Sequence, residues 1–435
     1  MVAHHLFLSY SRSDQERVDH LRRQLEQRGV DTFMDRDLEL GLSWPERLEK
    51  ALRETRAVAV FFGPAGLGRW QRREMYVALD RQVLEEKAGR AFPVVPVLLP
   101  QAREDDLGVS FLSLNTWVDL RRGVDDAETL DALARMALGS AEVRFEHPAG
   151  ELDVCPYRGL RPFRVEDSAF FFGREREVGE LLERVGKKKK GGLIAVIGPS
   201  GSGKSSLVQA GLIPRLYALQ PPAATWEAIV FRPGDEPFRS LARELAPILE
   251  PDLDKLDLIE KIPRLAATMK EHPEEPILQM LKDSRDTERI LLVVDQFEEI
   301  VAPPASRETG RDFVRSLLRL QERSPVTLLF TLRADFYGEV IQLDESLSRL
   351  VEQQGAFHVR PPDREELARV IRGPAEKLRV GLERGLVEHI LDDVGTEPGR
   401  LPLLEFALER LWYRDKGSGT LTLDGYQSVG KVERA

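Results

Sequence analysis

Cysteine is almost absent from this sequence: Cys155 is the only one among 435 residues. A single thiol excludes an internal disulfide and a CxxC metal site. No apolar run approaches the roughly 20 residues that a membrane-spanning helix needs, and the N-terminal MVAHHLFLSYS lacks the layout of a signal peptide. The chain is therefore expected to work in the cytoplasm.

Basic residues are outnumbered by acidic ones. Lys and Arg total 63 against 73 Asp and Glu, which gives a formal net charge of -10 and a pI near 5.5. Because a polyanion is held by clustered basic residues, this balance argues against bulk nucleic-acid binding. No internal repeat is visible, which excludes a solenoid or a propeller. The length and the 42% hydrophobic content predict two or three globular domains.

The first 140 residues alternate short apolar runs with amphipathic helical stretches. Strands are expected at HLFLSYS, VDTFMD, AVAVFFG, FPVVPVLLP and NTWVDLR. Helices are expected around ERVDHLRRQLEQRG, PERLEKALRET, the stretch that contains Glu74, and DAETLDALARMALG. Strands separated by helices of this length indicate a parallel sheet covered on both faces. We therefore predict an α/β domain over residues 1–140, followed by a linker over residues 141–156, where Pro, Gly and polar residues accumulate.

A second α/β series begins after this linker. Strands are expected at LIAVIG, WEAIVFRPG, RILLVVD, VTLLFTL and AFHVRPP. They indicate a nucleotide-binding sheet within a domain over residues 157–360. The pattern then becomes helical, which predicts a helical domain over residues 361–417. The final residues, 418–435, are interpreted as the start of a winged-helix segment or a tail.

The strongest motif is GPSGSGKS at residues 198–205, which fits the GxxxxGK(S/T) phosphate loop. A strand precedes it and a helix follows, so backbone N–H groups would wrap the phosphates of ATP or ADP at a helix N-terminus. The lysine would reach the β and γ oxygens, and the following hydroxyl would ligate Mg²⁺. The predicted nucleotide-binding residues of this loop are Gly198, Gly201, Gly203, Lys204, Ser205 and Ser206.

Three acids and an arginine complete the predicted nucleotide site. Asp295 ends the strand RILLVVD, where a carboxylate would hold the Mg²⁺ shell together with Ser205. Glu298 and Glu299 follow, and either could orient the water for ATP hydrolysis; Glu299 is slightly favoured, and an exposed acid pair at a helix start is the alternative. Arg333 ends VTLLFTL, where a γ-phosphate sensor would reach in; a surface ion pair is the alternative.

The motifs of the second half follow an order that resembles the bacterial STAND NTPases, relatives of the NACHT and NB-ARC switches of innate immune receptors. The resemblance starts near Cys155 and runs through CPYRGLRPFRVEDSAFFFGREREVGEL, the phosphate loop, FRPGD, VVDQFEE, TLRADF and GRLPLLEFALERLW. It implies that Gly173 and Arg174 lie near the adenine and that Leu401 and Pro402 of a helical lid touch the nucleotide. It also implies a slow switch: ADP keeps the lid closed, ATP exchange opens it, and the open form oligomerises.

The N-terminal domain resembles a TIR domain over roughly residues 3–140, which implies a flavodoxin-like fold. The resemblance rests on FLSYS, VDTFMDRDLELGLSW and WQRRE, with residues 36–44 corresponding to the BB loop. It implies that Ser9, Ser11 and Arg12, at the end of the first strand, meet the ribose and phosphates of NAD⁺.

Glu74 is the predicted catalytic residue of this domain. In enzymatic TIR domains a WxxxE element, often WCxxE, supplies the glutamate; here it implies Trp70 and Glu74, with Gln71 at the cysteine position. The element follows the third strand, at the sheet edge where open α/β folds place their ligand crevices. A surface salt-bridge partner is the alternative for Glu74, because arginines surround it. Trp70 could stack on a base ring or be a core aromatic.

One carboxylate would be enough for this chemistry. Ordinary glycosidases need two, because the leaving oxygen must be protonated while the other face is attacked or stabilised. Nicotinamide leaves NAD⁺ from a nitrogen that is already cationic, so no general acid is required. A single glutamate could stabilise the oxocarbenium-like ribose, or hold its hydroxyls, while water attacks.

These features predict an autoinhibited TIR-STAND switch of innate, antiphage defence. ATP binding would drive homo-oligomerisation, and the gathered TIR domains would build NADase sites that deplete NAD⁺ or produce an ADP-ribose signal. No membrane partner is expected, and no sensor or trigger is identified. A non-enzymatic TIR adaptor and a plain ATPase or remodelling machine are the rival hypotheses.

Overall fold

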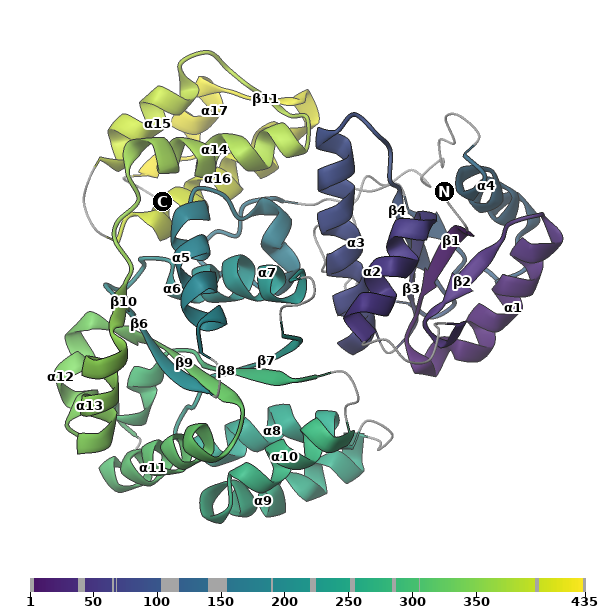
Figure 1. The fold of residues 1–435 in the computed structure, drawn as a ribbon. Helices are drawn as coiled ribbons and strands as arrows, with labels where there is room; N and C mark the ends of the chain where they lie inside the picture. Colours follow the sequence, from purple (N-terminus) through teal and green to yellow (C-terminus); the bar gives the residue numbers. More distant parts are fainter. Residues whose placement is uncertain are drawn as a thin grey trace. The chain divides into compact units, whose positions relative to one another are not determined.

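The computed structural model describes residues 4–37, 44–64, 66–67, 69–102, 117–139, 155–188, 191–219, 224–250, 255–283, 287–304, 306–395 and 399–432. The chain divides into two compact units (Figure 1). One comprises residues 1–156 with 166–170 and 217–222, and the other comprises the rest. Within the described ranges, no helix has both the length and the apolar character needed to cross a membrane.

The first unit contains a five-stranded parallel sheet in the order β2-β1-β3-β4-β5. The strands are β1 (His4–Ser9), β2 (Thr32–Met34), β3 (Thr55–Phe62), β4 (Val94–Leu98) and β5 (Val118–Asp119). The helices are α1 (Gln15–Gln27), α2 (Trp44–Glu54), α3 (Arg69–Lys87) and α4 (Ala127–Ala137). This strand order is that of flavodoxin-like sheets, so the fold predicted from the sequence is confirmed.

Alternation along the strands divides the apolar side chains between the two faces of this sheet. On one face, Leu6 and Leu8 of β1 belong to the same buried cluster as Val18, Leu21 and Leu25 of α1. These three α1 residues recur at helical spacing, which gives the helix one apolar stripe. Helices α2 and α3 contact each other and the adjacent strands β1 and β3. The sheet is therefore a buried central layer between helices.

The second unit contains another five-stranded parallel sheet, in the order β10-β6-β9-β8-β7. The strands are β6 (Gly192–Gly198), β7 (Trp226–Phe231), β8 (Arg289–Val294), β9 (Val326–Arg333) and β10 (Ala356–His358). All five strands expected from the sequence are present. Their apolar runs are buried in a core that includes Leu193, Leu292 and Phe330. In parallel sheets all carboxyl ends lie at one edge, which brings the ends of β6, β8 and β9 together.

Helices surround this second sheet. They are α5 (Glu175–Gly186), α6 (Lys204–Ser206), α7 (Ile213–Tyr217), α8 (Pro237–Leu249), α9 (Lys255–Glu271), α10 (Glu274–Asp283), α11 (Arg307–Arg323), α12 (Tyr337–Ile341) and α13 (Glu345–Gln354). A π-helical segment, Leu207–Leu212, joins α6 to α7. Helices α8, α9 and α10 are inserted between β7 and β8 and pack against one another (Figure 1). The sequence pattern did not reveal this insertion.

The C-terminal part of this unit is a helical lid, defined here as residues 364–432. It contains α14 (Arg364–Lys377), α15 (Leu386–Val394), α16 (Leu401–Asp415) and α17 (Leu423–Ser428). Strand β11 (Gly381–Leu382) pairs in parallel with β12 (Thr420–Leu421), and α17 packs on α16. The described part of residues 418–435, predicted to be the start of a winged-helix segment or a tail, thus pairs with and packs on the rest of the lid.

Candidate functional site

The phosphate loop follows β6 and ends at the N-terminus of α6. Gly201 and Gly203 have φ values of 71° and 84°, in the left-handed region that glycine adopts without a steric penalty. Lys204 is buried; its Nζ donates to the carbonyl oxygens of Gly198 (3.0 Å) and Pro199 (2.7 Å). Burial lowers the pKa of this lysine. The loop is therefore wrapped around its own lysine, and the contact of Lys204 with the β and γ oxygens of a nucleotide stays a prediction.

Asp295 follows β8 and faces the phosphate loop, as predicted. Its Oδ1 accepts hydrogen bonds from the hydroxyls of Ser205 (2.6 Å) and Thr331 (2.7 Å). Thr331 lies on β9 and was missed by the sequence reading, although a polar residue inside an apolar strand was a usable signal. Mg²⁺ is commonly held by one or two carboxylates plus substrate phosphates, so Ser205 and Asp295 suit an ion that arrives with ATP. No group of three potential metal-binding His, Cys, Asp or Glu side chains occurs in the described ranges.

The two glutamates after Asp295 point to different partners. Glu298 is buried, and its Oε2 accepts a hydrogen bond from the backbone N–H of Arg333 at 3.3 Å. Burial raises its pKa, opposed by hydrogen bonds from the backbone N–H groups of Glu298 and Arg333 and by the positive charges of Lys204 and Arg333. Glu299 Oε2 instead accepts from the backbone N–H of Gly234 at 2.9 Å. Glu298 thus lies at the end of β9, whereas Glu299 holds the loop after β7.

Two other predicted residues of this site are engaged within the protein. The Arg333 guanidinium donates to both carboxylate oxygens of Asp335, at 3.2 and 2.6 Å, so it is paired in this conformation. Its place at the end of β9 agrees with the prediction, but a γ-phosphate would have to compete with Asp335. The Ser206 hydroxyl accepts the backbone N–H of Phe163 at 3.1 Å. Ser206 therefore anchors the segment that precedes α5.

Gly173 and Arg174 connect the start of α5 to the phosphate loop and the lid. Arg174 is buried; its Nη2 donates to Ser202 O (3.1 Å), and its Nη1 donates to Arg360 O (2.9 Å). Gly173 has a φ of 80°, and a Cβ there would lie 2.5 Å from the carbonyl oxygen of Glu366 on α14. Only glycine fits this approach, which places the Gly173–Arg174 turn against the lid.

The N-terminus of α16 lies directly on the phosphate loop. A Cβ on Gly201 would be 3.0 Å from Pro402 Cγ, and a Cβ on Gly203 would be 3.4 Å from Leu401 Cδ2. A cavity of about 30 Å³ is bordered by Pro199, Gly201, Ser202, Pro361, Pro362, Leu367, Val394, Gly395, Gly399, Arg400 and Leu401. The leucine and proline predicted from the resemblance thus meet the loop, and a nucleotide at this loop would be in reach of the lid.

Residues Tyr157–Phe163, here called the strap, join the lid to the phosphate-loop helix. The buried Tyr157 donates its hydroxyl to Ile371 O of α14 at 2.7 Å. The Arg158 N–H donates to Glu405 Oε2 of α16 at 3.2 Å, and Phe163 is bonded to Ser206 as described above. The strap directly follows the predicted linker, so a movement of α14 or α16 would act on it.

Two acids of α16 hold the strap. Burial raises the pKa of Glu405 to about 8. Glu409, one helical turn further, forms an ion pair with Arg161 at 3.0 Å. A Cβ on Gly159, whose φ is 59°, would lie 2.1 Å from Glu409 Oε2. Neither glutamate was predicted as a functional residue; Glu405 is recognisable only as a charged residue within an apolar helix.

In the first unit, Glu74 and Ser9 meet at the boundary between β1 and β3. Ser9 ends β1 and is buried; its hydroxyl donates to Glu74 Oε2 at 2.6 Å. Glu74 is itself 4% exposed. The chain runs from β1 outward to β2 and returns to β3 on the other side, so this boundary is the topological switch point where such sheets bind ligands. This contact joins the carboxylate to a hydroxyl; the side chains of residues 69, 72 and 73, on which the salt-bridge alternative rests, lie outside the part that the structure describes.

Gln71 fixes the start of α3 above this switch point. Its buried side-chain amide donates to the carbonyl oxygen of Ser9 (3.2 Å) and, in a short hydrogen bond, to that of Phe61. The two acceptors belong to adjacent strands, β1 and β3. The glutamine at the expected cysteine position thus positions the helix that carries Glu74. The Trp70 side chain and residues 38–43 of the predicted BB loop lie outside the part that the structure describes.

The remaining predicted residues lie just beyond β1. Ser11 is partly buried and its hydroxyl is 3.0 Å from that of Ser13; Arg12 is exposed. Asp14, which the sequence reading missed, is buried against Gly63 at the end of β3, and its Oδ2 has no hydrogen-bond partner. Burial raises its pKa against the opposing charge of Arg17.

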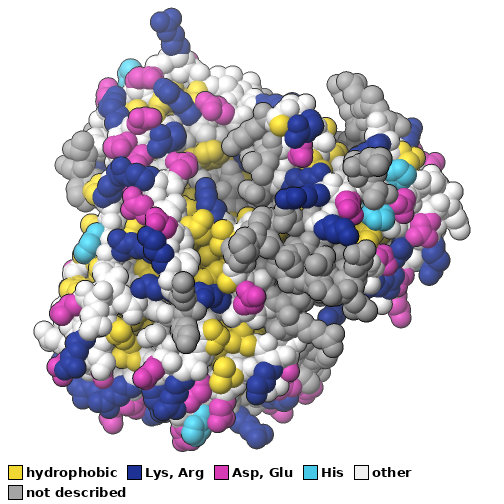
Figure 2. Space-filling model, viewed as in Figure 1, with side chains coloured by type: hydrophobic (Ala, Val, Ile, Leu, Met, Phe, Trp, Pro, Cys, Tyr) yellow, Lys and Arg dark blue, Asp and Glu magenta, His cyan; other side chains and the backbone are white. Residues whose placement is uncertain are grey.

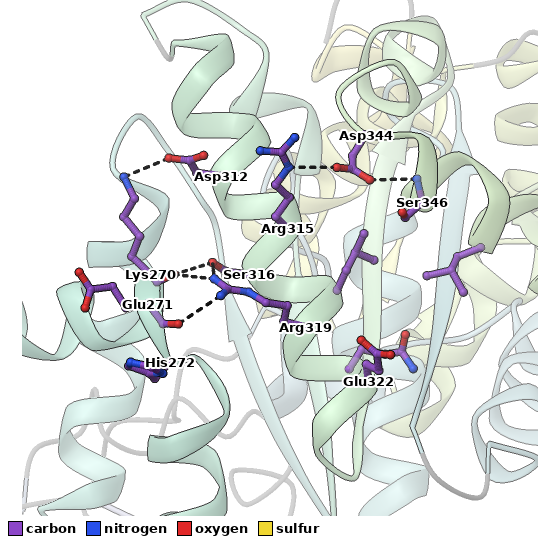
Figure 3. Close-up of a pocket in the computed structure, with 13 residues that line it drawn as sticks. Lys270, Glu271, His272, Asp312, Arg315, Ser316, Arg319, Glu322, Asp344 and Ser346 are labelled. Atoms are coloured by element: carbon purple, nitrogen blue, oxygen red, sulfur yellow. Dashed lines mark hydrogen bonds and ion pairs between the residues drawn. The ribbon is translucent and has the colours of Figure 1, made fainter.

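The surface of the second unit also carries a groove of about 1230 Å³ between α9, α11 and α13 (Figure 3). Its lining includes Lys270, Asp312, Arg315 and Asp344, so charges of both signs are mixed there. Arg319 donates from Nη2 to the Lys270 carbonyl oxygen at 2.8 Å, at the end of α9. The groove contains none of the predicted nucleotide-binding residues. Basic and acidic side chains are likewise interspersed over the described residues on the face shown in Figure 2.

Comparison with known proteins agrees with this division. The family model "Novel STAND NTPase 1" matches residues 156–435, and a TIR domain model matches residues 6–136. A search of curated proteins gave no match.

Solved structures similar to the chain include two ORC proteins and a domain of the replication initiation protein DnaA. The Aeropyrum pernix ORC2 protein, in ADPNP-ADP complexes, has a TM-score of 0.44 at 16% identity, covering 59% of this chain and 66% of that one. The Aeropyrum pernix ORC1 protein in complex with DNA has a TM-score of 0.44 at 15% identity, covering 60% and 65%. Domain III of Thermotoga maritima DnaA has a TM-score of 0.38 at 17% identity, covering 59% and 91%. The chain thus spans slightly under two thirds of each ORC chain.

The two sheets and their sites define a TIR domain joined to a P-loop NTPase with a helical lid. The chain belongs to the Novel STAND NTPase 1 family and has a TIR domain at its N-terminal end. This combination of a TIR domain and a STAND NTPase domain supports a nucleotide-regulated TIR receptor.

Proposed function

We propose that this chain is a nucleotide-switched receptor of innate, antiphage defence whose TIR domain hydrolyses NAD⁺. The observation that carries the enzymatic part is the Ser9–Glu74 pair, which sets a carboxylate at the switch point of the TIR sheet. The receptor would act in the cytoplasm.

The proposed reaction uses Glu74 to stabilise the ribose of NAD⁺ as its glycosidic bond breaks. When the bond between ribose C1′ and the nicotinamide nitrogen breaks, its electron pair stays on the nitrogen, and nicotinamide leaves as a neutral molecule. Water then attacks C1′ and loses a proton, which gives ADP-ribose. Glu74 offsets the positive charge that develops on the ribose, while Ser9 fixes the orientation of its carboxylate. Arg12, exposed at the end of β1, would pair with the diphosphate.

The proposed switch lies between the phosphate loop and the lid. Leu401 and Pro402 pack on the glycines of the loop, so a nucleotide bound there would change the contacts of the lid. ADP and ATP can shift the lid only to the extent that they bind its two positions differently. The strap would pass this movement toward the TIR domain. The open form would self-associate and raise the local concentration of TIR domains.

Nicotinamide release measured with ATP, with ADP and without nucleotide tests this proposal. We expect release with ATP, and a loss on the order of 100-fold in Glu74→Gln, because a group that stabilises the transition state is removed. Glu85→Gln is the matched control: Glu85 lies on the same helix and is paired with Arg90. Release by Glu74→Gln at the wild-type rate would refute the catalytic assignment.

A TIR adaptor without NADase activity is the second candidate, and the burial of Glu74 favours it. An adaptor would form oligomers with ATP, detectable by size-exclusion chromatography, but release no nicotinamide. Lys204→Ala, which removes the phosphate-binding lysine, should abolish oligomers under either proposal.

A further inference from the structure

Arg232 lies next to the carboxylate that is predicted to hold Mg²⁺. It follows the last residue of β7, the strand beside β8, and its Nε is 3.5 Å from Asp295 Oδ2. The carboxylate is almost fully buried, at 2% exposed, whereas the Arg232 side chain is 49% exposed. An arginine from outside the phosphate loop thus supplies positive charge to the metal-binding acid.

The two oxygens of Asp295 have different surroundings. Oδ1 is held at 2.6 and 2.7 Å by the hydroxyls of Ser205 and Thr331. Oδ2 faces Arg232 and the amide nitrogen of Gln209, both at 3.5 Å. That distance is the outer limit of a hydrogen bond, so these two contacts are weak and easily exchanged. Oδ2 is the oxygen that remains available to a metal ion or its water shell.

The turn that carries Arg232 is also tied to the segment after Asp295. Gly234 N–H donates to Glu299 Oε2 at 2.9 Å. In the amide orientation that satisfies both of its neighbours, Gln296 donates to Glu299 Oε1 at 2.9 Å and accepts from Arg232 Nη2 at 3.3 Å. A displacement of the Arg232 side chain would therefore change the contacts of Glu299 and of residues 232–234.

We propose that Arg232 is a positioning residue of the nucleotide site: it balances the charge of Asp295 in the absence of metal, and Mg²⁺ must displace it. This inference rests on the proposed binding of Mg²⁺ and ATP. Two cations beside one carboxylate repel each other, and the half-exposed arginine can move into water at little cost. The turn after β7 thereby senses whether metal and nucleotide are bound.

The test is the Mg²⁺ concentration that half-saturates binding of a fluorescent ATP analogue to the full chain. We expect Arg232→Gln to lower this concentration by about two- to fivefold, because the competing charge is gone; weak ion pairs have effects of this size. Arg232→Lys should stay near wild type. Arg239→Gln is the matched control: its side chain is also 49% exposed and pairs with Glu236, and it should change little.

An unchanged or higher Mg²⁺ requirement in Arg232→Gln would overturn the inference, as would an equal shift in Arg239→Gln. An unaltered thermal unfolding curve establishes that the variant is folded. If the wild-type chain bound no ATP analogue at any Mg²⁺ concentration, the nucleotide switch itself would fail, which is a distinct outcome.

Discussion

Replacing Glu405 by glutamine tests how the strap is held to the lid. Glu405 is buried on α16, and its Oε2 accepts the Arg158 N–H at 3.2 Å. Because burial raises its pKa to about 8, the carboxyl is protonated in the folded chain at neutral pH. Glutamine has nearly the same shape and keeps an acceptor oxygen for this hydrogen bond. The substitution therefore removes the titration and preserves the contact.

The magnitude follows from the difference between the folded and unfolded pKa values. In the unfolded chain the carboxyl titrates near its ordinary value of 4.5, so between that pH and about pH 8 only the folded state keeps the proton. The free energy of unfolding then falls as pH rises, by about 1.4 kcal/mol per pH unit. Between about pH 5 and about pH 7.5, titration of Glu405 lowers the free energy of unfolding of the wild-type chain by about 3 kcal/mol. This contribution is absent from Glu405→Gln.

Hydrogen–deuterium exchange of peptides from α16 measures this difference locally. Protection, corrected for the intrinsic exchange rate, should be similar in wild type and Glu405→Gln near pH 5 and greater in the variant near pH 7.5. Glu388→Gln is the control, because Glu388 is exposed and paired with Arg372. A difference between wild type and Glu405→Gln that is the same at both pH values would refute the reasoning.

Two further substitutions test the described contacts. Gly63→Ala places a Cβ 2.1 Å from both carboxylate oxygens of Asp14, so the free energy of unfolding of the TIR domain should fall by about 1–3 kcal/mol. A lower midpoint temperature of thermal unfolding would show this. Gly123→Ala is the control and should leave the midpoint unchanged, because no atom lies within 4 Å of the added Cβ. Glu298→Gln should slow phosphate release from ATP by roughly 100-fold or more, and Glu299→Gln should slow it less; the reverse order would restore the original preference for Glu299.

The fold could be predicted almost completely because its signals are local. Each strand of both sheets is a short apolar run, and the phosphate loop is a continuous motif from Gly198 to Ser205. The insertion α8–α10 was missed because amphipathic helices between two strands do not reveal how they pack. The pairing of the last residues could not be predicted for a similar reason: β12 has only two residues, and its partner β11 is distant in sequence.

The TIR and NTPase domains, the phosphate loop, Asp295 and the candidate Glu74 could be predicted from the sequence, because each depends on residue types at fixed spacing. What each acid faces depends on the folded chain: Glu298 accepts from the Arg333 N–H, Glu299 accepts from the Gly234 N–H, and Glu74 accepts from the Ser9 hydroxyl. The tertiary structure also showed the contact of Arg232 with Asp295 and the burial of Glu405. Such features join residues far apart in the chain, and the pKa of a carboxyl depends on burial and neighbouring charge, which only the folded chain defines.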